Sequence, residues 1–482
     1  MSSVLAEIWP WMVGCGALVV AVGASAHAIL NKRDVRAAIG WTGLIFFSPY
    51  IGALIYYVFG INRIRRRAVR LVSEASIESR QMRERESARL LREAATETPV
   101  YLQHLSRTVQ RATGAPLCFG NSVEPLLNGD RAYPEMLQAI RNAERSVAMA
   151  SYIFDRDRAG QMFLEALADA TERGVEVRVL VDGAGARYSR PPFTRDLRRR
   201  GIRVATFLPT RVPWTTAFMN LRNHRKLLIV DGRFGFAGGI NIREGCLLEQ
   251  PSDFPVQDLH FRIEGPVVEQ LFSTFAGDWI FTTGENLAGE AWARDSRIAG
   301  SVAARGIPDG PDEDFENLHW TLQAALGAAR SAVRVVTPYF LPETSLLAAL
   351  RLAAIRGVAV DIVLPEVNNL RFVQWAQTAQ LWQILEVGCR VWLSPPPFDH
   401  SKLMVVDDDW SLFGSANWDP RSLRLNFEFA VEAYDRSLAG SLARIADDKI
   451  AGSRRLSLEE VDERGLAVRL RDGVARLFLP YL

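Results

Sequence analysis

Two short segments of this sequence pair histidine with lysine at the same interval. The first reads Asn223-His-Arg-Lys-Leu-Leu-Ile-Val-Asp231 and leads to Gly238-Gly-Ile-Asn241, and the second reads Asp399-His-Ser-Lys-Leu-Met-Val-Val-Asp407 and leads to Gly414-Ser-Ala-Asn417. Counted from each histidine, lysine follows at position 2, aspartate at 7, a pair of small residues at 14 and 15, and asparagine at 17. One such pattern is weak evidence, but two copies with five matched intervals predict a functional site.

The histidines and lysines are the residues best suited to chemistry. If His-x-Lys begins a strand, both side chains point to the same face, so an imidazole and an ammonium group converge on one spot. Lysine is a compact cation with three donors suited to a phosphate oxygen. It is also rare here, because only four of 57 basic residues are lysine, namely Lys32, Lys226, Lys402 and Lys449. We therefore take His224, Lys226, His400 and Lys402 as candidate catalytic residues.

The rest of each motif adds candidates with a less direct role. Asp231 and Asp407 follow apolar runs at turn signals, which favours strand anchoring over direct chemistry, although both belong to the candidate catalytic set. The small and amide residues that follow would end the next strand, let a ligand approach the backbone and add donors; they are Gly239, Asn241, Ser415 and Asn417. In one isolated copy, the same residues would fit a strand-to-helix turn capped by asparagine.

Composition narrows the class of protein. A chain of 482 residues with 48% apolar and 23% charged residues has material for sizeable cores, which excludes a disordered or collagen-like protein. The formal charge of +2 is too balanced for a protein that mainly binds nucleic acid, so no nucleic-acid partner is expected. The sequence has no Walker loop, dinucleotide fingerprint or zinc-ligand spacing, so we expect neither a cofactor nor a metal.

The N-terminus carries two apolar stretches. Residues 8–30 and 37–61 are each long enough to cross a hydrocarbon core of about 30 Å as a helix, and they predict a two-helix transmembrane hairpin within residues 1–62. The alternative is a cleaved signal peptide followed by a buried helix, but the first stretch lacks a basic leading segment. The cluster Arg63, Arg65, Arg66, Arg67 and Arg70 follows the second stretch. By the positive-inside bias, it places the bulk of the chain in the cytoplasm.

The remainder repeats one plan twice. Residues 63–114 predict a charged helical linker. Residues 147–154, 159–173 and 175–182 then predict strand, helix and strand, and residues 333–340, 346–356 and 358–364 predict the same order. This alternation favours two α/β domains over residues 115–305 and 306–482, with the Gly- and Pro-containing stretch 306–314 as the boundary.

At these residues the chain resembles the phospholipase D superfamily, whose signature is a doubled HxKxxxxD motif followed by GGxN or GSxN. The N-terminal hairpin and the segment Gly414-Ser-Ala-Asn-Trp-Asp-Pro-Arg-Ser422 are similar to those of bacterial cardiolipin synthases. The resemblance covers nearly the whole chain. It implies two similar phospholipase D-like domains, each a mixed sheet flanked by helices, whose two motifs form one metal-independent site.

The resemblance also implies a mechanism. It assigns His224 as nucleophile, giving a phosphatidyl-histidine intermediate, and His400 as general acid and then base. The lysines and asparagines would hold the non-bridging oxygens of the phosphate. Each histidine needs an orienting carboxylate, and the family implies a crossed arrangement in which Glu428 supports His224 and Asp258 supports His400. Spacing alone leaves Asp258 equally open to being a surface strand residue.

The implied reaction joins two phosphatidylglycerol molecules into cardiolipin and releases glycerol, in a multi-pass protein of the bacterial inner membrane. The expected partners are phosphatidylglycerol and other anionic membrane lipids. Water or serine as acceptor would instead make the same site a phospholipase D or a phosphatidylserine synthase. A catalytically silent lipid-binding scaffold is disfavoured because both motifs are intact. Two apolar stretches, residues 212–219 and 370–382, are candidates for lipid contact, although a helix packed on the sheet is the commoner explanation for the second.

Overall fold

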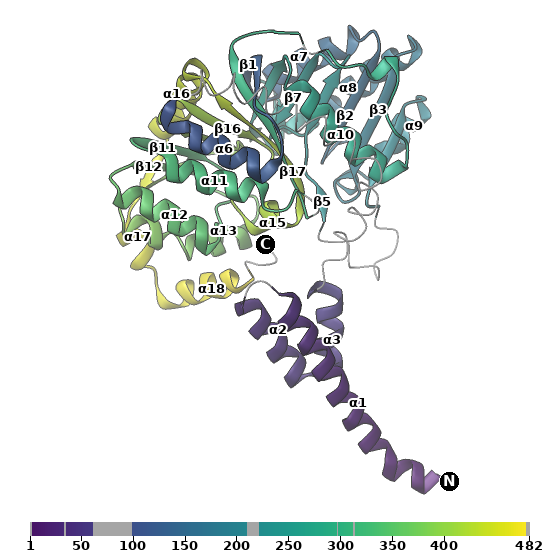
Figure 1. The fold of residues 1–482 in the computed structure, drawn as a ribbon, viewed down its shortest axis with the longest axis vertical. Helices are drawn as coiled ribbons and strands as arrows, with labels where there is room; N and C mark the ends of the chain where they lie inside the picture. Colours follow the sequence, from purple (N-terminus) through teal and green to yellow (C-terminus); the bar gives the residue numbers. More distant parts are fainter. Residues whose placement is uncertain are drawn as a thin grey trace. The chain divides into compact units, whose positions relative to one another are not determined.

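The computed structural model describes residues 2–32, 35–60, 99–209, 221–295, 297–311 and 314–478 (Figure 1). The chain divides into two compact units: an N-terminal unit, described over residues 2–60, and a much larger second unit that contains both motifs. The predicted helical linker falls largely on residues 61–98, and the apolar stretch 212–219 falls within residues 210–220. Both of these lie outside the described residues.

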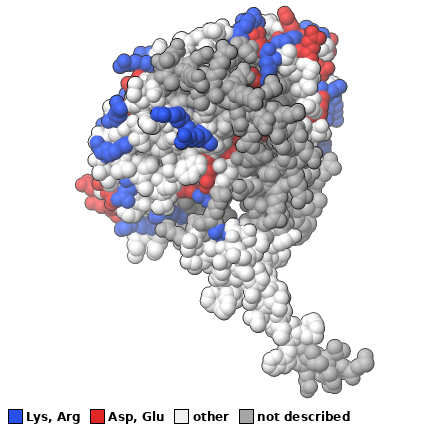
Figure 2. Space-filling model, in the orientation of Figure 1, with Lys and Arg blue, Asp and Glu red and all other residues white. Residues whose placement is uncertain are grey.

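The N-terminal unit begins with one long apolar helix, α1 (Ser2–Asn31). Its segment Trp9–Asn31 is the one described helix that is long and apolar enough to cross a membrane. Outside the grey atoms, the N-terminal helices are almost entirely white in Figure 2, whereas charged side chains are scattered over the visible face of the second unit. The first predicted span is therefore present as a helix of the expected length and character.

The second apolar stretch does not form the single helix predicted over residues 37–61. It forms α2 (Val35–Phe47) and α3 (Pro49–Ile55), followed by the π-helical turn η1 (Tyr56–Gly60). In a straight helix, Trp41 and Tyr56 would lie about 22 Å apart, but their ring centroids are 5.3 Å apart. The stretch therefore turns back on itself at Ser48-Pro49, where proline cannot continue the hydrogen bonding of α2.

Polar bonds and small residues hold this folded-back stretch against α1. The Tyr50 hydroxyl donates to the Val13 carbonyl oxygen at 2.7 Å, and Tyr56 Oη lies 2.8 Å from His27 Nδ1. A β-carbon on Gly52 would lie 2.4 Å from the Leu44 carbonyl oxygen, so glycine is needed where α3 crosses α2. Because Tyr50 contacts the middle of α1 and Tyr56 contacts its end, α3 runs parallel to α1.

The described residues of the second unit form one continuous mixed sheet of 16 strands, of which 15 follow one another in order and the last, the two-residue β5 (Arg222–Asn223), lies off this path. In the first half the strand order is β1 (Cys118–Leu127), β9 (Leu259–Glu264), β7 (Phe234–Gly238), β6 (Leu227–Val230), β2 (Ser146–Ser151), β3 (Glu176–Asp182) and β4 (Arg203–Phe207). In the second half it is β10 (Val302–Asp309), β17 (Asn426–Tyr434), β16 (Trp410–Gly414), β15 (Leu403–Val406), β11 (Ala332–Val336), β12 (Ala359–Pro365), β13 (Arg390–Ser394) and β18 (Arg454–Leu456). The first seven strands correspond one to one, and β1 pairs with β10 where the halves meet.

Helices cover both faces of each half (Figure 1). In the first half, α7 (Asn128–Arg141) and α8 (Arg158–Glu172) bury their apolar sides in one core, while α10 (Val268–Thr283) contacts the same strands with residues outside that core. In the second half, α11 (Asn317–Ala328) and α12 (Thr344–Ile355) form the core, and α16 (Arg436–Ala451) covers the other face. The repeated strand–helix–strand order β2–α8–β3 and β11–α12–β12 confirms the predicted repeat.

Two predicted boundaries differ from the structure. The first eight residues of the second half form strand β10, so the boundary predicted at residues 305 and 306 falls inside a strand. Gly306 is a strand residue there because the Phe429 ring packs on it: a β-carbon would lie 2.7 Å from that ring. The end of the predicted linker is helix α6 (Gln103–Thr113), whose Leu105 and Val109 are buried in the core of the second half. Residues 99–114 therefore belong to the folded unit.

Candidate active site

Each motif histidine is anchored by a strand of the opposite half. The two-residue strand β5 (Arg222–Asn223) pairs with β17, and β14 (Phe398–Asp399) pairs with β8 (Val256–Gln257). Directly after these pairs, the His224 amide donates to the Phe427 carbonyl oxygen at 2.9 Å and the His400 amide donates to the Gln257 carbonyl oxygen at 2.7 Å. The two imidazole centroids then lie 6.4 Å apart, with their planes at 83°.

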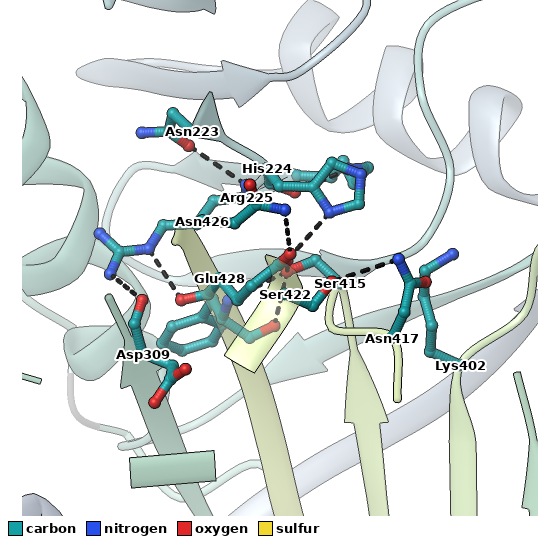
Figure 3. Close-up of polar contacts among 12 residues, drawn as sticks. Asn223, His224, Arg225, Asp309, Lys402, Ser415, Asn417, Ser422, Asn426 and Glu428 are labelled. Atoms are coloured by element: carbon teal, nitrogen blue, oxygen red, sulfur yellow. Dashed lines mark hydrogen bonds and ion pairs between the residues drawn. The ribbon is translucent and has the colours of Figure 1, made fainter. Parts of the chain in front are cut away.

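The two implied carboxylates lie beside the histidines in the crossed arrangement. Glu428 Oε2 is 3.0 Å from His224 Nδ1, and Asp258 Oδ2 is 2.7 Å from His400 Nδ1. In Figure 3 the Glu428 carboxylate receives dashed lines from His224, Ser415 and Asn426. The crossing follows from the strand pairing, because each carboxylate is the next residue after the carbonyl that binds the histidine amide of the other half. Asp258 is 3% exposed, so it is a site residue and not a surface one.

The two motif lysines are buried next to their histidines. Lys226 Nζ donates to the His224 carbonyl oxygen at 2.6 Å, and Lys402 Nζ donates in the same way to His400. Regular strand structure begins only after each lysine, at Leu227 and Leu403, because the ladder is interrupted where the motif crosses to the other half. The condition that His-x-Lys begins a regular strand is therefore not met, yet both cations still adjoin the histidines.

Burial dominates the electrostatics of the four groups. It lowers the pKa of both His224 and His400 to about 4; the lysine charges add to this, and the carboxylate beside each ring opposes it. Burial also lowers the pKa of Lys226 to about 7 and that of Lys402 to about 8, against the opposing effect of Glu428 and Asp258. The site is thus a buried place where an added negative charge would stabilise the protonated form of all four groups.

The small residues of the motifs shape the carboxylate positions. A β-carbon on Gly239 would lie 2.1 Å from Asp258 Oδ1, so only glycine leaves room for that carboxylate. The equivalent Ser415 donates its hydroxyl to Glu428 Oε2 at 2.5 Å. These two residues were predicted to bind phosphate, and the contacts found here are with the orienting carboxylates instead.

The two motif asparagines are buried at the starts of the following loops. Asn241 Oδ1 accepts from the Ile153 amide at 3.2 Å, and Asn417 Nδ2 donates to Ser422 Oγ at 3.2 Å. Asn241 is 8% exposed and Asn417 is 5% exposed. Neither contact is a helix cap: α15 (Pro420–Arg424), which follows Asn417, is capped by Asp419, and the turn after Asn241 begins at Arg243 without a side-chain cap. The cap interpretation was therefore wrong, and both asparagines lie buried in the motif region.

Asp231 and Asp407 lie at the far ends of the motif strands. Asp231 accepts from the backbone amides of Glu144, Arg145 and Ser146 at 2.8–3.0 Å. Asp407 binds the amides of residues 330–332 in the same way. A strand rises about 3.3 Å per residue, so seven residues separate each aspartate widely from its histidine. These contacts support the anchoring role that the turn signals favour, and the place of both aspartates in the candidate catalytic set stays a prediction.

A buried ion pair behind each motif escaped the sequence analysis. Arg225 is 3% exposed, binds Asp278 of α10 at 2.6 Å and donates to the Glu428 carbonyl oxygen at 2.9 Å. In the second half, Asp399 binds Lys449 of α16 at 2.5 Å. Period-two alternation was the available signal for Arg225, because the middle residue of His-x-Lys must face away from the site.

Two tyrosines also flank the histidine rings. The Tyr152 ring centroid lies 5.0 Å from that of His224, and the Tyr339 centroid lies 6.5 Å from that of His400. Each follows the matching strand of its half, β2 or β11, but the two tyrosines are one position apart in the repeat, because Tyr339 corresponds to Ile153. Among the described residues, no group of three or more His, Cys, Asp or Glu side chains is arranged to hold a metal ion.

Comparison with known proteins identifies the family. The family described as "Cardiolipin synthase, PLD-like domain" matches residues 136–279 and 322–449, and the family described as "Phospholipase_D-nuclease N-terminal" matches residues 19–60. The chain is 30% identical to cardiolipin synthase 1 of Bacillus anthracis, over 96% of this chain and 92% of that protein. It is 31% identical to cardiolipin synthase A of Pseudomonas fluorescens SBW25, over 95% of each chain.

The fold is also found in a solved structure. Phosphatidylserine synthase of Haemophilus influenzae Rd KW20 aligns with a TM-score of 0.61 over 78% of this chain and 100% of that chain, at 15% identity. At this identity the likeness concerns the fold alone. The matched sequence families, by contrast, cover both motifs and most of the second unit. The chain belongs to the cardiolipin synthase family of phospholipase D-like proteins.

Proposed function

We propose that this protein is a cardiolipin synthase that transfers a phosphatidyl group from one phosphatidylglycerol to the glycerol hydroxyl of another. The observation that carries the proposal is the pair of crossed histidine–carboxylate contacts, 3.0 Å and 2.7 Å long, with a lysine beside each histidine. Two imidazoles at a centroid distance of 6.4 Å can flank one phosphodiester. This is the arrangement that a two-step displacement through a covalent intermediate requires.

In the first step one imidazole attacks phosphorus. A P–N bond forms, the P–O bond to glycerol breaks, and the second imidazole gives its proton to the departing glycerol oxygen. In the second step, the glycerol hydroxyl of another phosphatidylglycerol gives its proton back to that imidazole and attacks phosphorus, so the P–N bond breaks and cardiolipin forms. One phosphodiester replaces another, so the reaction needs no nucleotide.

The hydrogen bonds support His224 as nucleophile and His400 as acid and base. Glu428 Oε2 accepts from both His224 and Ser415, and its Oε1 accepts from Asn426. Asp258 Oδ2 accepts from His400, while its other oxygen accepts from the Leu259 amide. An oxygen shared between two donors stabilises an imidazolium less than an oxygen given to one. The proton is therefore better held on His400, and His224 is left neutral, as a nucleophile must be.

The negative charge of the substrate phosphodiester sets the protonation states of the two histidines. Without a bound anion both imidazoles are neutral at pH 7, because burial holds the pKa of each near 4. A phosphodiester between them raises the pKa of each imidazole by its negative charge, so binding is coupled to protonation of His400. Lys226 and Lys402 stand beside the same point, and each uses only one of its three protons on a histidine carbonyl. We assign them, with Asn241 and Asn417, to the non-bridging oxygens.

We further propose that α1 anchors the protein in the bacterial inner membrane with the second unit in the cytoplasm. Residues 32–36 carry Lys32, Arg33 and Arg36, and five arginines follow residue 62. In a two-pass hairpin these basic flanks would lie on opposite faces of the membrane. If the folded-back second stretch does not cross the membrane, both flanks lie on one face and the positive-inside bias is satisfied for each. This single crossing replaces the multi-pass arrangement expected from hydropathy.

The acceptor is tested by product analysis. Purified full-length protein in phosphatidylglycerol vesicles with excess EDTA is expected to yield cardiolipin and glycerol in equal amounts, measured by mass spectrometry. Phosphatidic acid as the main product would assign the site to hydrolysis. His224→Gln and His400→Gln are each expected to abolish turnover without loss of fold by circular dichroism. Near-normal turnover in either variant would contradict the two-histidine mechanism.

A further inference from the structure

The C-terminal helix of the second unit exposes an apolar face to solvent. Helix α18 (Leu466–Leu477) presents four large apolar side chains that are more than half exposed: Leu466 at 73%, Leu470 at 61%, Val474 at 53% and Leu477 at 77%. Exposed apolar residues scattered singly are ordinary, but four on one helix need an explanation. Among the described residues of the second unit, this helix has the longest such row.

The four side chains form one stripe directed away from the protein. At about 100° per residue, they lie within an arc of about 80° on the helix. The residues of α18 that are buried, Asp472 and Ala475, project from the opposite side. One face of α18 is thus buried against the protein, and the opposite face is apolar but exposed. This outer apolar face is therefore not part of the protein's core.

The charges beside the stripe identify the environment it fits. The helix carries Arg469, Arg471 and Arg476 and a single acid, Asp472. That acid is turned inward, where it binds Arg464 and Arg471. Arg471 also covers the Trp375 ring at 4.4 Å. A helix with an apolar outer face bordered by arginines is typical of segments that lie in the interface of an anionic membrane.

The position of α18 links this face to the active site. The inner face of α18 packs on α13 (Arg371–Thr378), where Ala475 shares a small buried cluster with Leu341, Val373 and Ala376. Tyr339 packs against the same cluster, and its ring lies 6.5 Å from the ring of His400. Only these two layers of side chains separate the helix from the catalytic histidine, so a bilayer at α18 would bring headgroups to that side of the unit.

We propose that α18 lies in the interface of a bilayer containing anionic phospholipid, with its apolar stripe among the acyl chains and its arginines at the headgroups. The second unit then contacts the membrane itself and does not merely follow the N-terminal anchor. The segment 370–382, one of the two candidates for lipid contact, includes α13, on which α18 packs. The inference rests on the proposed lipid substrate, and it can be tested by position without any measurement of turnover.

The direct test is the depth of a label on α18 in the full-length protein. A fluorophore sensitive to polarity is attached to Leu470→Cys in a Cys15→Ser background, because Cys15 is the exposed cysteine among the four. Reconstitution uses vesicles of phosphatidylcholine and phosphatidylglycerol with spin-labelled acyl chains. Glu172→Cys, at the exposed end of α8, is the matched control. We expect strong quenching at position 470 and none at position 172.

Equal quenching at the two positions would overturn the proposal. So would self-quenching of the Leu470 label that rises with protein density and not with spin-labelled lipid, because it would show a second copy of the chain on the stripe.

Measurements of activity test the proposal independently of the label. Leu470→Glu with Leu477→Glu is expected to raise the KM for phosphatidylglycerol in vesicles several-fold and to leave turnover in mixed micelles unchanged. The control Ile355→Glu, an exposed residue of α12, should change neither. An unchanged KM in the double variant would also contradict the proposal. Absence of turnover in the unsubstituted protein as well as in both variants would instead contradict the proposed function.

Discussion

Replacing Gly239 by alanine should impair catalysis through Asp258 alone. The added β-carbon would lie 2.1 Å from Asp258 Oδ1 and 2.7 Å from Oδ2, and real β-carbons essentially never approach an atom below 3.0 Å. The carboxylate must therefore retreat by about 1 Å or more to regain van der Waals contact. Its hydrogen bond to His400, now 2.7 Å, is then lost. Gly239 does not have a positive φ, so alanine adds no backbone strain at this position.

The size of the effect follows from the charge on His400. A hydrogen bond to a charged group contributes about 1.5–3 kcal/mol, and the Asp258 contact stabilises His400 in its protonated state. Loss of that energy in the transition state lowers kcat by about 10- to 150-fold. The KM for phosphatidylglycerol should change much less, since Lys226 and Lys402 are untouched.

The assay is cardiolipin formation in phosphatidylglycerol vesicles, with Gly277→Ala as the control. Gly277 lies on α10 and an added β-carbon there meets nothing within 4 Å, so this variant measures any general cost of the substitution. A double variant gives the sharper reading: Gly239→Ala should cost nothing further in an Asp258→Asn background. Equal kcat in the Gly239→Ala and Gly277→Ala variants, or additive losses in the double variant, would refute the reasoning.

Three further outcomes are expected. Because burial lowers the pKa of Lys226 to about 7 and that of Lys402 to about 8, both lysines lose their charge as pH rises and the KM should rise from pH 6 to pH 9, whereas Lys226→Arg should remove the part of the rise near pH 7 and keep the part near pH 8. Asp231→Ala removes the acceptor of three backbone amides and should lower the free energy of unfolding by about 2 kcal/mol, measured by denaturant titration, with kcat unchanged; a loss of kcat in the folded variant would support the place of Asp231 in the catalytic set. Lys32→Cys, in the Cys15→Ser background, should react with an impermeant maleimide from the same face of the membrane as Glu172→Cys; labelling from opposite faces would restore the two-pass hairpin.

The sequence predicted the site well because the chemistry is carried by a repeat. Matched intervals identify His224, Lys226, His400 and Lys402 without any structure, and the structure places these four side chains together. The carboxylates were reached only through the family resemblance, since Asp258 has no spacing signal of its own. Pairing between β5 and β17, and between β14 and β8, supplies what the intervals lack, namely which half each histidine meets.

The fold was predicted less completely, for identifiable reasons. Hydropathy measures how apolar residues 37–61 are and not the direction in which they run, so the reversal at Ser48-Pro49 was missed. Gly306 and Pro308 read as loop residues, yet they pair with β17 because the Phe429 ring needs the space that glycine leaves. Leu105 and Val109 of α6 carry an apolar face in a polar helix, but sequence does not say that this face packs on the second half.

Neither half of the second unit can hold a complete site alone. The His224 amide and ring both bind residues of β17, and the His400 amide and ring both bind the segment around β8, so each histidine is positioned by the other half. The halves join at β1 and β10, where Asn121 Nδ2 donates to the Val302 carbonyl oxygen at 3.0 Å. A shift along this junction would move Glu428 away from His224 and Asp258 away from His400 at once. The single continuous sheet therefore keeps the proposed nucleophile and the proposed acid in register with each other, which a two-step transfer through one phosphorus atom requires.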